Sequence, residues 1–274
     1  MSIPKFDNLE ITTFPSGVCE IAFNRPKVLN AFSAELYKNW LDALTWASTS
    51  KLVKVVVLTG RGRFFSSGKA LERPDFSPEG IAKSTARRQT VKSLVDQLIE
   101  FPKLLIAAVN GPAYGFAVTH LALCDVVYTV PHATFTTPFM KLGFSAEGCS
   151  SYLFPMIMGR SRANEMLLMG RTFSAQEAIE SNLVSRSYPA ENFRQTILGL
   201  AEDAAKFSAD ALATTKKLSR DPERDLLLRV NAEETIRLNE RQNSKDSIET
   251  VIRFAEEAER KRAEKAAKKQ QSKL

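Results

Sequence analysis

The sequence predicts an α/β fold with a helical C-terminal region. Short apolar runs typical of buried strands alternate with helical patterns over the first 190 residues, and the pattern after Glu191 is helical. The composition is that of a globular chain, since 44% of the 274 residues are hydrophobic and 25% are charged. No apolar stretch approaches the roughly 18 residues that a membrane-spanning helix needs, so we expect no membrane span.

The first predicted elements are a hairpin and a helix. Leu9–Thr13 and Val18–Phe23 are short alternating runs on either side of the turn sequence Pro15–Gly17. Ser33 is placed as the N-cap of a helix that ends near Ser50, because large apolar side chains recur there every four residues.

A strand–loop–helix cycle is expected next. Val53–Thr59 is apolar and β-branched, as buried parallel strands are, and Gly60–Gly68 is a loop rich in glycine and serine. Glu72–Ala86 carries the turn residues proline and glycine, so we expect an irregular segment there, followed by a helix over 87–100.

The cycle then recurs. Leu104–Val109 is a second buried strand, and Gly115–Leu123 is a short apolar helix. Strands are expected at Asp125–Val130 and Ala133–Thr136, and the pattern from Cys149 to Met169 is helical.

The C-terminal part is expected to be helical after one more strand. Ser174 is placed to cap a short helix, and Leu183–Ser187 is the last predicted strand. Helix then runs from Glu191 through Leu226–Arg241 and Ser247–Lys269.

The net charge of +7 is concentrated at one end of the chain. Residues 260–274 contain seven Lys or Arg and one Glu, a balance of +6, which leaves about +1 for the other 259 residues. A nucleic-acid surface needs basic charge on the fold itself, interleaved with residues that read bases. We therefore expect no nucleic-acid partner.

The cysteines and histidines are too sparse for a metal site. Cys19, Cys124 and Cys149 are odd in number and widely spaced, so we expect buried free thiols. His120 and His132 are the only histidines, and no Ser-His-Asp motif accompanies them.

Three segments carry candidate chemistry. Phe64–Ala70 ends in a Gly-Lys pair after a strand, but its spacing and Ala70 do not fit a phosphate loop. Val109–Ala117 runs from a buried strand through a tight turn into a helix start, where backbone N–H groups lack partners. Thr136–Ser151 holds Glu147 among apolar residues, which raises a carboxyl pKa towards that of a useful base. Taken singly, these remain a connecting loop, a βα turn and a glutamate that stabilises a helix start.

Together and in this order, the three segments resemble the crotonase family, also called the enoyl-CoA hydratase/isomerase family. The resemblance runs from about Leu9 to Asn243. Three runs are similar to the peroxisomal Δ3,Δ2-enoyl-CoA isomerase subgroup: Ala133–Gly143, Glu147–Ser151 and Asn231–Glu234. The resemblance implies a crotonase-type ββα spiral core.

The resemblance also implies the reaction and the site. The reaction is isomerisation of 3-enoyl-CoA, cis or trans, to trans-2-enoyl-CoA in peroxisomal β-oxidation of unsaturated fatty acids. Glu147 matches the single acid/base, and the N–H groups of Lys69 and Phe116 match the oxyanion hole. The substrate-binding positions implied are Ser66, Ser67, Gly68, Lys69, Ala70, Leu71 and Gly115. No metal or other cofactor is implied, since CoA belongs to the substrate.

Departures from the family pattern leave alternatives open. The family commonly has an uncharged residue at Lys69 and an acid at Ala70; we expect the Lys69 ammonium to reach solvent and its N–H to act. Thr119 and Phe139 occupy the positions of the two hydratase carboxylates, so hydration should be weak or absent. The alternatives are an enoyl-CoA hydratase/isomerase of a fatty-acid-derived secondary metabolite pathway, or a non-catalytic acyl-CoA-binding homologue.

The expected location and assembly complete the sequence hypothesis. Ser272-Lys273-Leu274 matches a receptor-read peroxisomal address, so we expect import into the peroxisome matrix by the cognate receptor. The family implies homotrimers or hexamers. The expected divisions are a spiral core, a helical trimerisation region and a basic tail with the targeting signal, at residues 1–200, 201–259 and 260–274.

Overall fold

A mostly parallel sheet that begins with an antiparallel hairpin lies at the centre of the molecule. The computed structural model describes residues 3–70, 75, 77–254, 256–257 and 260. In this part of the chain the sheet order is β1 (Leu9–Thr13), β2 (Val18–Phe23), β3 (Val55–Gly60), β4 (Leu104–Val109), β6 (Val126–Thr129) and β9 (Arg186–Ser187). β1 and β2 are antiparallel, and the later pairs are parallel.

A second, smaller sheet has three short strands. It contains β5 (Ala113–Tyr114), β7 (Thr134–Thr136) and β8 (Phe173–Ser174). β5 and β7 are parallel, whereas β7 and β8 are antiparallel. After β4 and again after β6 the chain adds a strand to the small sheet, β5 and then β7, as expected for a ββα spiral.

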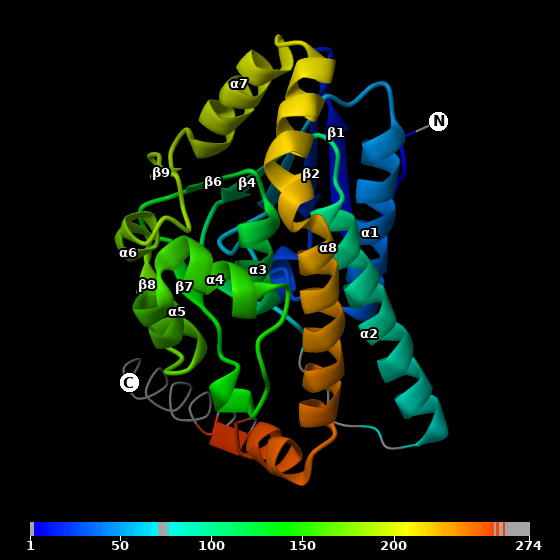
Figure 1. Ribbon diagram of the computed structural model, residues 1–274, viewed down its shortest axis with the longest axis vertical. Helices are drawn as coiled ribbons and strands as arrows, with labels where there is room; N and C mark the ends of the chain where they lie inside the picture. The colour runs from blue at the N-terminus through cyan, green and yellow to red at the C-terminus, as the bar shows by residue number, and fades with distance from the viewer. Residues whose placement is uncertain (1–2, 71–74, 76, 255, 258–259, 261–274) are drawn as a thin grey trace, which may run out of the picture.

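Helices surround the two sheets. They are α1 (Ala34–Thr49), α2 (Pro78–Ile99), α3 (Phe116–Thr119), α4 (Ser150–Met158), α5 (Arg160–Leu167), α6 (Ala175–Glu180), α7 (Phe193–Ala205) and α8 (Ala209–Gln242). Residues 245–254 are also helical. Figure 1 shows α8 running down the molecule between α2 on one side and α4 on the other, and it contacts both.

The core explains the apolar runs in the sequence. β2 and β3 are buried at every residue, and β4 at all but its first. Parallel strands covered on both faces are nearly continuously hydrophobic. α1 packs Trp40 against the ring of Phe23, with centroids 4.9 Å apart, and Ser33 caps this helix by accepting from Leu36 N–H as predicted.

The prediction for Glu72–Ala86 is wrong in its second half. Helix α2 begins at Pro78, and the Ser77 hydroxyl accepts a hydrogen bond from Gly80 N–H at 3.1 Å. Proline is favoured in the first turn of a helix, where its missing N–H costs nothing. The same proline and glycine that suggested irregular structure therefore belong to a helix start.

Other boundaries also differ from the predictions. The helical stretch predicted from Cys149 to Met169 is two helices, broken at Gly159, whose φ is +74°. α3 gives way to a 3-10 helix at His120–Leu123, and the last strand is only Arg186–Ser187. α8 is one helix of 34 residues despite Pro222, and it lies within the region after Glu191 that was expected to be helical.

The remaining sequence expectations concern thiols, metals and membranes. Cys19, Cys124 and Cys149 are buried and free, as predicted. Within the described residues no cluster of three His, Cys, Asp or Glu side chains is arranged to hold a metal ion. Across the same residues no helix is long and apolar enough to cross a membrane. The division of the chain at residue 200 falls within α7 and stays a prediction.

Candidate active site

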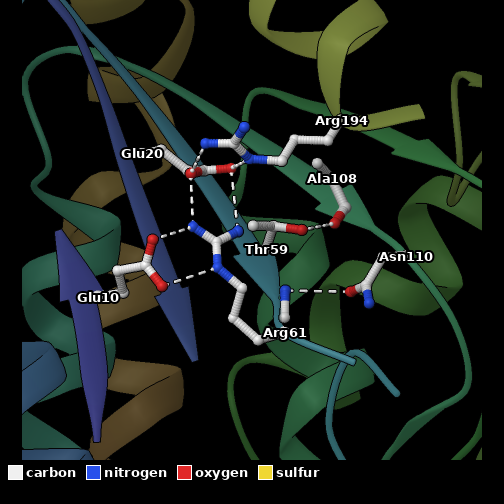
Figure 2. A network of polar contacts seen from close by, with 8 residues as sticks. Glu10, Glu20, Thr59, Arg61, Ala108, Asn110 and Arg194 are labelled. Atoms are coloured by element: carbon white, nitrogen blue, oxygen red, sulfur yellow. Dashed lines mark hydrogen bonds and ion pairs between the residues drawn. The ribbon is translucent and has the colours of Figure 1, made fainter. Parts of the chain in front are cut away.

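Two asparagines fix the loop that leaves β3. The buried Asn30 directs its amide nitrogen at three backbone oxygens, with distances of 2.9, 2.8 and 3.2 Å to Arg61, Phe64 and Phe65. Asn110, after β4, accepts from Gly60 N–H at 3.0 Å, as Figure 2 shows. Every one of these contacts pins backbone atoms, so the course of the loop is set before it reaches residue 66.

A charged network holds the same loop to the hairpin and to α7 (Figure 2). Arg61 pairs with Glu10 and Glu20, each at 2.7 Å, and Arg194 of α7 pairs with Glu20 at 2.8 Å. Glu20 is only 1% exposed. Burial acts to raise the pKa of Glu20, but the hydrogen bonds from the two arginines outweigh it and hold that pKa below its usual value.

The loop then becomes a short strand that aims the Lys69 N–H. Phe32 N–H donates to Gly68 O at 2.8 Å, and Ala70 N–H donates to Phe32 O at 2.9 Å. In such a parallel bridge, Lys69 directs its own N–H away from Phe32. Gly68 has a φ of +77° and approaches Tyr114 O so closely that a Cβ there would lie 2.5 Å from it.

The start of α3 lies beside this strand. Tyr114 N–H donates to Ser66 O at 3.0 Å, and Gly115 N–H donates to Thr136 O at 2.8 Å. Phe116 is the first residue of α3, so its N–H has no carbonyl partner within the helix. The bridge between residues 66 and 113 therefore brings the segments of Lys69 and Phe116 side by side.

Glu147 lies half-buried on the wall of a cavity of about 50 Å³ between α2 and α8. The cavity is lined by Tyr37, Lys69, Arg87, Arg88, Val91, Val95, Glu147, Gly148, Asn231, Glu234, Thr235, Leu238, Asn239 and Gln242. Burial raises the pKa of Glu147 to about 7; the Lys69 ammonium acts in the opposite direction, and the charge of Glu234 adds to the rise. A carboxyl group with this pKa can accept and return a proton near neutrality.

The backbone next to Glu147 has an unusual shape that α8 supports. Gly148 and Cys149 both have positive φ, +66° and +62°, and a Cβ on Gly148 would lie 2.8 Å from the Thr119 hydroxyl. Glu234 of α8 accepts from Cys149 N–H at 2.7 Å and from Ser151 N–H at 2.9 Å. It thus caps the start of α4 and fixes the position of Glu147.

Asn231 and Glu234 support the candidate site through contacts that the sequence analysis missed. Asn231 donates from its amide to Lys92 O at 3.1 Å and to Asp96 at 2.8 Å, which ties α8 to α2. Both side chains are buried on a helix that is otherwise mostly exposed. The detectable signal was their i, i+3 spacing, which places the two polar residues on one face of the helix.

Lys69 lies on the cavity wall with Glu147 and is partly exposed. Its ammonium lies 5.5 Å from the centre of the Phe144 ring, and the expected solvent contact of this group stays a prediction. A cation over an aromatic face is stabilised by the ring quadrupole. The position near Glu147 gives the side chain an electrostatic effect that a backbone role alone does not include.

Two of the other predicted residues, Ser66 and Ser67, hold the loop in place through hydrogen bonds. Ser66 is buried, donates to Asn30 O at 2.7 Å and accepts from Gly68 N–H at 3.0 Å. Ser67 N–H donates to Leu29 O at 2.9 Å. Leu71 and Ser272–Leu274 lie outside the described residues.

Thr119 and Phe139, the residues at the positions matched to the hydratase carboxylates, lie inside the fold. Thr119 and Phe139 are both buried, and the Thr119 hydroxyl is 3.4 Å from Phe116 O. Neither side chain is a carboxylate. The described part of the site therefore presents Glu147 and the capped Glu234 as the carboxylates on its cavity wall.

The spiral of two sheets places this molecule in the crotonase fold. A crystal structure of an enoyl-CoA hydratase/isomerase from Pseudoalteromonas atlantica is similar, with a TM-score of 0.83, 28% identity and coverage of 92% of this chain and 98% of that one. The family model of enoyl-CoA hydratase/isomerase matches residues 13–264. The chain belongs to the enoyl-CoA hydratase/isomerase family.

Two relatives carry isomerase names. Human "Enoyl-CoA delta isomerase 2" is 41% identical over 251 residues, which are 91% of this chain and 63% of that protein. Mouse "Enoyl-CoA delta isomerase 3, peroxisomal" is 37% identical over 246 residues, covering 89% of this chain and 77% of the relative. The chain thus spans less than two thirds of the human relative.

Proposed function

We propose that this protein isomerises 3-enoyl-CoA, cis or trans, to trans-2-enoyl-CoA. The observation that carries the proposal is Glu147, a half-buried carboxyl on a cavity wall whose pKa lies at about 7. The other carboxylate on that wall, Glu234, is occupied by two N–H groups of α4. One available acid/base fits a reaction in which one group removes and returns the same proton.

The proposed reaction starts with Glu147 as its carboxylate. It takes a proton from carbon 2 of the thioester, and the C–H electron pair passes into an enolate whose charge lies largely on the thioester oxygen. Electrons then shift to give a double bond between carbons 2 and 3, and protonated Glu147 gives the proton to carbon 4. The C3–C4 double bond is lost, and atoms and charge balance.

The enolate oxygen needs preorganised donors. The N–H groups of Lys69 and Phe116 are proposed for this role, because the first points away from Phe32 and the second begins α3. Backbone donors in a site from which water is excluded can contribute about 3–4 kcal/mol each to the transition state. The Lys69 ammonium near Glu147 adds positive charge on the same side of the cavity.

Hydration is the less favoured reaction. Addition of water to an enoyl thioester requires groups that hold and activate a water molecule, and the family places carboxylates there. Thr119 and Phe139 stand in those positions, and both are buried. We therefore propose that isomerisation predominates, without a resident metal or other cofactor, because the substrate itself supplies the CoA.

The test is turnover of 3-hexenoyl-CoA by the purified chain, followed through absorbance of the conjugated product. We expect Glu147→Gln to lower kcat at least a hundredfold, because general base catalysis is typically worth 10²–10⁴. Glu165→Gln, an exposed glutamate outside the cavity, is the matched control. A wild-type chain that binds hexenoyl-CoA without converting it would instead support the non-catalytic homologue.

We also propose a peroxisomal location and a role in breakdown of unsaturated fatty acids. Ser272-Lys273-Leu274 matches the receptor-read address, and the mouse relative carries "peroxisomal" in its name. Deleting these three residues should move the protein to the cytosol without loss of activity, in cells that lack the full-length chain. Continued import of the truncated protein in those cells would contradict this proposal. From the family we also propose that the chain forms a trimer or a hexamer. Light scattering measures the molar mass that tests this.

A further inference from the structure

Tyr37 lies on the wall of the Glu147 cavity with an unused hydroxyl. Only 3% of the residue is exposed, and its side chain lines the cavity. Among the described residues, none forms a hydrogen bond with the Tyr37 hydroxyl or with the Glu147 carboxylate. Both residues line the cavity, so water or a bound substrate can supply a hydrogen-bond partner to each.

The ring of Tyr37 is seated against the proposed oxyanion hole. Its centroid lies 5.3 Å from that of Phe32, whose backbone pairs with the Lys69 segment, and 5.7 Å from that of Phe116. The Tyr37 ring therefore packs against the two residues Phe32 and Phe116, and Tyr37 lines the same cavity as Glu147.

The charged groups around the cavity leave one anionic acceptor for this hydroxyl. Lys69, Arg87 and Arg88 line the same cavity and are donors. The oxygens of Glu234 already accept from the N–H groups of Cys149 and Ser151. Glu147 is the carboxylate that remains.

We propose that Tyr37 is a positioning residue, whose hydroxyl donates a hydrogen bond to one oxygen of Glu147 when an acyl group fills the cavity. The cavity of about 50 Å³ has room for only a few water molecules, which can bridge the two groups in the free protein. A hydrocarbon chain displaces this water and offers no acceptor of its own. One oxygen of Glu147 is then held, and the other is left to move the proton.

The Tyr37 hydroxyl keeps its proton and so can donate. Burial raises the pKa of Tyr37 well above its usual value, and the neighbouring Glu147 charge raises it further, so the phenol stays protonated. A hydrogen bond to the charged form of a carboxyl group lowers the pKa of that group. Loss of the phenol should therefore raise the pKa of Glu147 in the complex, and only there.

The experiment titrates Glu147 directly by ¹³C NMR of protein labelled at the glutamate carboxyl carbon. Wild type and Tyr37→Phe are compared free and with hexanoyl-CoA, a saturated ligand that cannot react. Glu147→Gln assigns the resonance. We expect the Glu147 pKa in the complex to be about one pH unit higher in Tyr37→Phe than in wild type, and equal in the two free proteins. Tyr128→Phe, in β6 against Tyr188, is the control and should change neither value.

Two results would overturn this role. The first is an equal Glu147 pKa in the wild-type and Tyr37→Phe complexes. The second is a rise of the Glu147 pKa in free Tyr37→Phe as large as the rise in its complex. Either result means that acyl binding does not create the hydrogen bond. The Tyr37 inference rests on the proposed function, but different results reject the inference and the isomerase proposal. A shifted titration without turnover of 3-hexenoyl-CoA by wild type rejects the isomerase proposal alone, whereas no binding of hexanoyl-CoA rejects both. With turnover, Tyr37→Phe should lower kcat about tenfold with KM little changed.

Discussion

Lys69 contributes to the candidate site in two ways, through its backbone N–H and through its side-chain charge. Its N–H is directed away from Phe32, while its ammonium lies over Phe144 and lowers the pKa of Glu147. The first action depends on the backbone of the loop, and the second depends on the charge. The two are therefore separable by substitution.

We expect Lys69→Met to move the acid limb of kcat/KM to higher pH. The methionine keeps the backbone N–H and most of the apolar stem, but it removes the charge that favours ionised Glu147. At high pH, where Glu147 is ionised in both proteins, kcat should stay within about tenfold of wild type, a difference of about 1.4 kcal/mol. A pH–rate profile measures both effects. An unmoved acid limb would show that the ammonium does not influence the base.

Ionised Glu147 should reduce the stability of the folded protein. Its pKa of about 7 in the folded protein lies above the ordinary glutamate value of 4.5, so between these pH values the folded chain keeps a proton that the unfolded chain has lost. Stability from this group is therefore lost as pH rises from about 4.5 to about 7. Glu147→Gln should be more stable than wild type at pH 8, by on the order of 2–3 kcal/mol. Urea denaturation at pH 8 and at pH 5 should show the gain only at the higher pH.

At the residue scale, the sequence pointed to the proposed base, Glu147, but not to the residues that contact or surround it. Glu147 was visible because an acid among apolar residues is rare, and burial has the predicted effect on its pKa. Tyr37 and Glu234 were not visible, because each lies more than 80 positions from Glu147 in the chain. Their relation to Glu147 exists only after the helices pack, as does the position of Lys69 on the cavity wall.

The N-terminus of α4 is capped by a side chain from another helix, α8. The N–H groups of Cys149 and Ser151 have no carbonyl partner inside α4, and the Glu234 carboxylate from α8 accepts from both. Burial raises the pKa of Glu234, whereas the two N–H groups act to lower it.

We expect Glu234→Gln to destabilise the protein and to change its pH profile. A glutamine has one acceptor oxygen, so one of the two N–H groups loses its partner, at a cost of about 1–3 kcal/mol. Removing the negative charge should also lower the pKa of Glu147, so the acid limb should move to lower pH. Glu233→Gln, an exposed neighbour that pairs with Arg237, is the control and should change neither. Thermal unfolding and the rate profile provide the two readouts.

Element types were predicted better than element ends. The strands of the large sheet follow from β-branched runs, and Ser33 correctly marks the start of α1. α2 was placed too late because Pro78 is equally compatible with a turn and with a helix start. The break at Gly159 was missed because its positive φ is a property of the folded chain.

At the scale of the molecule, a buried carboxylate joins three regions. Glu20 of β2 pairs with Arg61 after β3 and with Arg194 of α7. Removing one partner of a buried charge cluster leaves the others without compensation, which typically costs about 3–5 kcal/mol.

We therefore expect Glu20→Ala to lower the free energy of unfolding by about 3–5 kcal/mol at pH 7. The pKa of Glu20 is lowered in the folded protein, so its contribution is present above the pKa of an unfolded glutamate and is lost as pH falls below it. Chemical denaturation at pH 7 and pH 3.5 measures both. The comparison variant is Glu10→Ala, which removes a half-exposed partner and should cost less than about 1 kcal/mol.

The overall architecture was the most predictable level. Alternation of strands and helices followed by helices alone defines an α/β core with a helical end, and the resemblance to crotonases supplied the spiral. What patterns could not supply is the placement of α8, which lies along α2 and α4 and forms one wall of the cavity. Its polar, exposed surface gives little sign of where it docks.

The cap that α8 provides has a consequence for biosynthesis. Cys149 and its partner Glu234 are separated by 85 positions, so a ribosome has made the whole large sheet well before the cap of α4 exists. A nascent or prematurely terminated chain that ends before residue 234 can pair its strands, yet it lacks the helix that shields and fixes Glu147. We therefore expect no isomerase activity until translation is nearly complete. Truncated products should be partly folded and should lack this activity.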